Sequence, residues 1–112
     1  MTAGAAAVKA GEPVYTGGFA DEALLQKVKD ALRITSEYLD GELMDIIDAC
    51  AADLSIAGVC VSARPIVIRA VILYAKAHFS FSADGKRFHE MYDSLKNVLR
   101  LSREFRAENR DV

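Results

Sequence analysis

Hydrophobic residues recur at the spacing of one face of an α-helix in four stretches of this chain. The first stretch runs from Asp21 to about Arg33, where acidic residues at the start suit a helix N-terminus. The second begins near Leu39 or Asp40 and ends near Ile56. Asp40 is a candidate N-cap of this helix, and Gly58 is a good helix stop. The predicted inward positions of the two helices are Leu24, Leu25, Val28 and Leu32, then Leu43, Ile46, Ile47, Cys50 and Leu54.

The third stretch follows Pro65 and is apolar almost all round, reading IVIRAVILYAKAHF over residues 66–79. Its β-branched side chains also suit a strand, but its length favours a helix. A helix that is apolar on all sides is the central one of a small bundle. Arg69 and Lys76 are seven residues apart and share the one polar face, which is either solvated or meets a partner.

The fourth stretch runs from about Lys86 to Arg103 and has a strong apolar stripe. Leu101 and Phe105 fall outside that stripe, and an exposed apolar pair near a chain end is a sign of a docking surface. The predicted inward residues are Phe88, Met91, Tyr92, Leu95, Val98 and Leu99.

Short connections between these stretches predict an all-α fold, a small four-helix bundle-like domain over residues 20–105. Residues 1–19 are rich in alanine and glycine and are predicted to form a flexible arm. The arm is either disordered or ordered against a neighbouring subunit, with Tyr15 and Phe19 as anchors. Residues 106–112 form a polar C-terminal tail.

Composition narrows the class of protein. The chain has 112 residues, 52% hydrophobic and 27% charged, with a net charge of -2. These values exclude a disulfide scaffold, a collagen-like chain, a coiled-coil rod and a generic basic nucleic-acid module. Neither an export signal nor a membrane-spanning run is visible, so we expect a protein made in a reducing cytoplasm that does not bind membranes. Cys50 and Cys60 are expected to be reduced and mostly buried.

The charges are unevenly distributed along the chain. Residues 20–60 hold nine acidic and three basic side chains, a net of -6, whereas residues 61–112 hold six acidic and ten basic ones, a net of +4. Such polarity suits a subunit that assembles with copies of itself or bridges two surfaces. The alternative is that both sets are solvated helix faces.

The sequence contains no recognisable catalytic constellation, cofactor motif or metal-ligand spacing, so we expect neither an enzyme nor a bound cofactor or metal. Lys96, Arg100 and Arg103 are spaced for one stripe of the fourth helix. That stripe supports an alternative function, a helical DNA-binding regulator that contacts phosphates.

The chain also resembles a known family, through the pattern of residues 65–102 and of Val28–Ile34 (VKDALRI). The pattern is an apolar helix, Ala70–Ala77, closed by Phe79 and Phe81, and then a helix with Arg87-Phe88 and Tyr92–Lys96. It is similar to that of phage head–tail connector (adaptor) proteins, and the resemblance covers about residues 24–105.

The resemblance implies a structural virion protein at the head–tail interface. Subunits of this kind form a dodecamer-type ring beneath the portal protein, extend the DNA channel and meet a stopper or tail-completion protein; DNA passes without sequence-specific binding. The expected portal-docking residues are Leu101, Arg103, Phe105 and Arg106. The expected subunit contacts are Arg69, Lys76, Asp45, Asp48, Tyr15 and Phe19.

Overall fold

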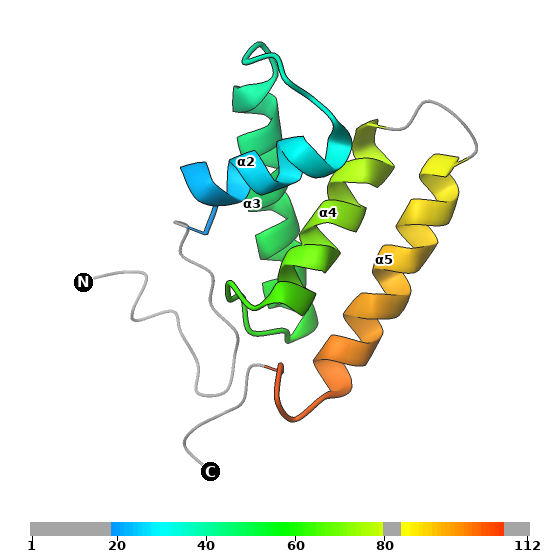
Figure 1. The fold of residues 1–112 in the computed structure, drawn as a ribbon. Coiled ribbons are helices and arrows are strands. Elements are labelled where there is room, and N and C mark those ends of the chain that lie inside the picture. The colour runs from blue at the N-terminus through cyan, green and yellow to red at the C-terminus, as the bar shows by residue number, and fades with distance from the viewer. Residues whose placement is uncertain (1–18, 80–83, 107–112) are drawn as a thin grey trace.

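The computed structural model describes residues 19–79 and 84–106 (Figure 1). Within them the chain forms α2 (Glu22–Leu32), α3 (Asp40–Ala57), α4 (Pro65–Phe79) and α5 (Asp84–Leu101). The predicted all-α class is therefore confirmed. Of the predicted arm only Phe19 is described, and of the predicted tail only Arg106; the remaining residues of both lie outside the described part of the chain.

Helix α4 is the centre of the fold, as its apolar sequence predicts. It packs against α2, α3 and α5 and lies between α3 and α5 (Figure 1). Val67, Ala70 and Val71 are completely buried on it. Each of the two buried valines contributes about 1.5–3 kcal/mol relative to exposure. Its burial is not uniform, however, because Arg69 is exposed and Ile72 is half-buried.

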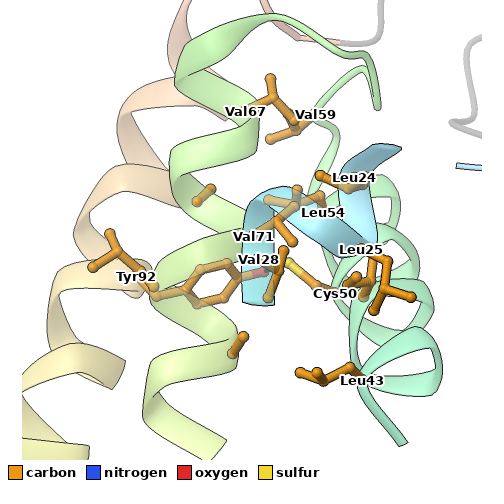
Figure 2. Close-up of a cluster of buried hydrophobic side chains, with 14 of the residues drawn as sticks. Leu24, Leu25, Val28, Leu43, Cys50, Leu54, Val59, Val67, Val71 and Tyr92 are labelled. Atoms are coloured by element: carbon orange, nitrogen blue, oxygen red, sulfur yellow. Dashed lines mark hydrogen bonds between the residues drawn. The ribbon is translucent and has the colours of Figure 1, made fainter. Parts of the chain in front are cut away.

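The core is formed where α2, α3 and α4 meet. Val28 of α2, Leu54 of α3 and Val71 of α4 lie together, and Cys50 lies beside them (Figure 2). Tyr92 enters the same core from α5 and is 1% exposed. One continuous hydrophobic cluster therefore joins all four described helices.

Helix ends follow local chemistry at some positions and not at others. Asp21 caps α2, since its Oδ1 accepts a hydrogen bond from the Leu24 amide at 2.9 Å. Gly58 ends α3 at φ 95°, a left-handed conformation that glycine adopts at low cost. The expected N-cap role of Asp40 is wrong: α3 begins at Asp40 after Leu39, which makes no side-chain cap.

Asp40 instead forms an ion pair between two helices. Its Oδ1 lies 2.7 Å from Nζ of Lys29, whose side chain is only 7% exposed. A buried lysine needs such a partner because an unpaired charge is costly to remove from water. The pair therefore fixes the start of α3 against α2.

None of the helices in the described ranges is long and apolar enough to cross a membrane.

Candidate interaction surfaces

After α5, the C-terminal segment of the described chain turns back toward the connection between α3 and α4. The Phe105 and Arg106 amides donate to the Ser102 carbonyl at 3.2 and 2.9 Å. The Cys60 amide then donates to the Phe105 carbonyl at 2.7 Å, and Val59 and Arg106 form an isolated antiparallel bridge. We call residues 102–106 the C-terminal strap.

Arg64 holds the C-terminal strap from the other side. Its Nη2 lies 2.8 Å from Oε2 of Glu104, and its guanidinium carbon lies 4.3 Å from the centre of the Phe105 ring. The ion pair is exposed and contributes little by itself. Phe105 is half-buried against the core, so apolar packing supplies the main anchor of the strap.

The four predicted docking residues therefore have different surroundings. Leu101 is 66% exposed, and Arg103 is exposed beyond the end of α5. Phe105 does not form an exposed pair with Leu101, because the strap folds it onto the core. Arg106 is exposed while its backbone bridges Val59.

A basic groove lies between α2 and α4. It has a volume of about 390 Å³. Lys27, Arg69 and Lys76 line it, together with Ile68 and Ile72. Arg69 and Lys76, two of the predicted subunit contacts, thus share one surface, and Nζ of Lys76 lies 5.5 Å from the centre of the Phe88 ring.

The other predicted subunit contacts lie elsewhere. Asp45 and Asp48 are exposed on α3, and Asp48 already has a partner within the chain. Phe19 is half-buried against the core. Tyr15 lies outside the described residues.

An apolar groove of about 510 Å³ lies between α4 and α5, and the sequence did not predict it. Met91 and Val98 line it and are 46% and 60% exposed, although the apolar stripe of α5 predicted them inward. The rest of the fold covers only one side of the apolar stripe of α5. Tyr92 and Leu99 are buried on that side, whereas Met91 and Val98 stay exposed. Leu73 of α4 also lines the groove.

A polar cluster joins α3 to α5 beside the core. The Tyr92 hydroxyl donates to Oδ2 of Asp53 at 2.6 Å, and Nζ of Lys96 donates to the same oxygen at 3.0 Å. Burial raises the pKa of Asp53, but hydrogen bonds from Tyr92 and Lys96 and the Lys96 charge outweigh it, so the pKa is lowered overall. The cluster therefore keeps a carboxylate and an ammonium paired at the helix contact.

Cys50 and Tyr92 stay protonated in this cluster. Burial raises the pKa of Cys50 to about 12, even though its Sγ lies 3.7 Å from the Tyr92 hydroxyl. Burial also raises the pKa of Tyr92, reinforced by neighbouring Cys50 and Asp53. A thiol in this state is a poor nucleophile. Cys60, by contrast, is exposed, so the expectation of two mostly buried cysteines holds for Cys50 alone.

The three residues of the basic stripe expected on the last helix differ in their surroundings. Lys96 is paired with Asp53, and Arg103 lies beyond Leu101, where α5 ends. Of the three residues, Arg100 remains exposed on α5, with its Nε donating to Asn97 at 3.1 Å. The structure therefore adds no support to the alternative of a DNA-binding regulator, which stays a prediction from the sequence.

Comparison with known families adds the decisive finding. The family model for phage connector proteins matches residues 24–106, about three-quarters of the chain, which include α3, α4, α5 and all but the first two residues of α2. The chain belongs to the phage connector protein family. No curated protein and no solved structure matches it.

The family assignment confirms the resemblance of the helical pattern and gives this connector its general role. It is a phage structural protein that assembles with other head or tail proteins, and its family is not an enzymatic one. In the described part of the connector, no group of three or more His, Cys, Asp or Glu side chains could hold a metal ion.

Sequence reasoning missed three features of the connector: the strap, the apolar groove and the polar cluster. The strap depends on contacts between residues about forty positions apart, such as Arg64 and Glu104, which no local pattern reveals. The cluster had one sequence signal, a tyrosine in the inward stripe of α5, because a buried tyrosine hydroxyl usually needs a partner. Asp53 is that partner.

Proposed function

We propose that this connector forms a ring of identical copies beneath the portal protein, extends the DNA channel and presents its far side to a stopper or tail-completion protein. The family match over residues 24–106 carries the proposal. In a ring beneath the portal protein, the connector lies at the head–tail interface of the virion.

The charge distribution supports a ring. In a closed ring, one face of each subunit meets a different face of the next. The acidic segment, residues 20–60, includes α2 and α3, and the basic segment, residues 61–112, includes α4 and α5. The net charge of -2 also suits a channel that must not bind DNA tightly.

For contact with the portal, we propose the surface around Leu101 and Arg103. Both side chains are exposed at the end of α5, and Leu101 is 66% exposed. Phe105 packs on the core and so anchors the C-terminal strap that carries Arg103. We include Arg106 in the proposed contact because it is exposed and follows these residues in the chain.

The test is assembly with the portal protein of the same phage, followed by size-exclusion chromatography and electron microscopy. The wild-type connector is expected to co-elute with the portal and to appear as a ring on it. The double variant Leu101→Asp/Arg103→Glu is expected to lose co-elution. Its control is Lys86→Glu/Arg87→Glu, which changes two exposed residues at the start of α5, the end of the helix opposite to Leu101.

Two results would count against these proposals separately. Failure of the wild-type connector to bind the portal would overturn the proposed function. Full binding by Leu101→Asp/Arg103→Glu would instead show that the portal contact lies elsewhere on the connector.

A further inference from the structure

Two oppositely charged surfaces of the connector point away from each other. On α4, Arg69 is two residues from both Val67 and Val71; at 3.6 residues per turn, this places it on the side opposite the buried ones. On α3, Asp45 is likewise two residues from the buried Leu43 and Ile47. Since α3 and α4 pack against each other, the two charged side chains face outward on opposite sides of the molecule.

The basic groove between α2 and α4 has the features of a receiving surface. Its cations, Lys27, Arg69 and Lys76, line it together with the half-buried Ile68 and Ile72, and none of its lining residues in the described part of the chain is acidic. Lys27 and Arg69 are exposed, and Arg69 and Lys76 are about 10 Å apart along the axis of α4. A ligand that fits this groove combines carboxylates with an apolar side chain.

The outward face of α3 has that composition. Helix α3 contains no lysine or arginine. Glu42 and Asp45 are exposed in its first half, and Ala49 is exposed further along. Ile56, near its end, is 83% exposed, which is a high value for a large aliphatic residue. The small side chain of Ala49 allows another helix to approach closely.

We propose that the α2–α4 groove of one connector receives the outward face of α3 of a second copy. Glu42 and Asp45 then face the cations of the groove, and Ile56 packs against its isoleucines. This inference rests on the proposed ring and specifies its subunit contact. Because the two surfaces differ and lie on opposite sides of the molecule, the contact is heterologous and can repeat from copy to copy around a ring.

Charge favours the pairing of the groove with α3 over the pairing of either surface with its own copy. Groove against groove would bring Lys27, Arg69 and Lys76 close to their own copies, and α3 against α3 would do the same for carboxylates. The apolar groove between α4 and α5 has a rim of mixed sign, with Arg87 and Glu90, so it shows no such preference.

Charge reversal provides a sharp test. The variant Lys27→Glu/Arg69→Glu makes the groove acidic, so that both contact surfaces are negative. The variant Glu42→Lys/Asp45→Lys makes α3 basic, so that both are positive. Each variant alone is expected to form rings on the portal at least about tenfold more weakly than wild type, because like charges then meet at every contact.

An equimolar mixture of the two variants is expected to recover ring formation. Every contact between unlike copies again pairs a positive with a negative surface, so the copies alternate around the ring. Wild-type association should weaken as salt is raised, since exposed charges are screened. Circular dichroism melts verify that each variant is folded. The variant Ile56→Ser changes an exposed side chain and tests the contact between Ile56 and the isoleucines of the groove independently of charge.

The control is Lys86→Glu/Arg87→Glu at the start of α5, which makes the same change in net charge as Lys27→Glu/Arg69→Glu but outside the basic groove, and it is expected to assemble normally. Rings of normal stability from each reversed variant alone would overturn the inferred contact and leave the proposed function standing. So would loss of rings by both variants without recovery in the mixture. Absence of rings from the wild-type connector would overturn the proposed function, and the contact with it.

Discussion

At the scale of single residues, the fold places reactive or charged groups where their surroundings control them. The two cysteines show this most clearly. Cys50 lies in the core beside Tyr92 with its pKa raised to about 12 by burial, whereas Cys60 is exposed in the connection after α3. The same residue type is therefore inert at one position and accessible at the other.

We predict that a thiol reagent such as Ellman's reagent modifies one cysteine of the native protein at pH 8 and both after denaturation. The fast thiol is Cys60, so Cys60→Ser should leave no rapidly reacting group in the folded chain. Rapid reaction of Cys50 in that variant would show that the core opens readily.

The raised pKa of Cys50 also makes the stability of the protein depend on pH. Above about pH 8.5 the cysteine ionises in the unfolded chain but not in the folded one, so the free energy of unfolding declines as the pH rises.

The buried Lys29–Asp40 ion pair supports a second prediction at this scale. Asp40→Ala leaves a buried ammonium without its partner and is expected to lower the free energy of unfolding by about 3 kcal/mol. Lys29→Met removes the buried charge while keeping an apolar side chain, so its cost should be clearly smaller. Urea denaturation of both variants measures the difference; equal losses would contradict a dominant cost of the unpaired charge.

At the scale of helices, the ends decide where each element begins and stops. Gly58 ends α3 in a left-handed conformation, and open space surrounds the position where a side chain would begin. Gly41 also has open space around it but lies in the first turn of α3. Steric crowding is therefore excluded at both positions, and the effect of adding a side chain depends on the backbone conformation.

Alanine at these two positions should have opposite effects. Gly58→Ala is expected to destabilise the protein by about 1 kcal/mol, because alanine disfavours a positive φ. Gly41→Ala is expected to stabilise it by about 0.5–1 kcal/mol through helix propensity and a less flexible unfolded chain. Thermal melts of the two variants and the wild type give the comparison; a shift of the same sign for both would contradict this account.

Prediction from sequence was most successful at this scale, for physical reasons. The period of apolar residues defined the four helices, and the start of α4 at Pro65 followed from proline tolerance in a first turn. The period could not show how much of the α5 stripe would be covered, and so Met91 and Val98 were placed inward. Coverage depends on neighbouring helices, which a local pattern does not contain.

The interaction surfaces were only partly accessible from sequence. Arg69 and Lys76 were recognised as one face of a helix, because seven residues make nearly two full turns. The role of Lys27 in the same groove was not, since it comes from α2. Phe105 was misplaced because its partner, Arg64, is distant in sequence.

At the scale of the whole molecule, the C-terminal strap links the end of α5 to the connection between α3 and α4. The hydrogen bond from the Cys60 amide to the Phe105 carbonyl and the Arg64 contacts hold it. The strap therefore holds the last described residues against the rest of the fold, and with them the proposed portal surface.

We predict that Phe105→Ala releases the strap without unfolding the helices. Hydrogen exchange at the Cys60 amide should become at least about tenfold faster, because its acceptor is no longer held in place. Amides in the middle of α4 should keep their wild-type protection. The control is Arg103→Ala, which changes an exposed residue of the same strap. Unchanged hydrogen exchange at the Cys60 amide in Phe105→Ala would show that the strap does not depend on the Phe105 side chain.

The strap has a further consequence for the connection between α3 and α4. Arg106 ends the described chain beside Val59, while Phe19, where the description begins, lines a pocket with Ala63 of the same connecting loop. Phe19 and Arg106, far apart in the sequence, therefore both contact the connection between α3 and α4. A substitution in that connection would disturb both segments at once, although neither adjoins it in the chain.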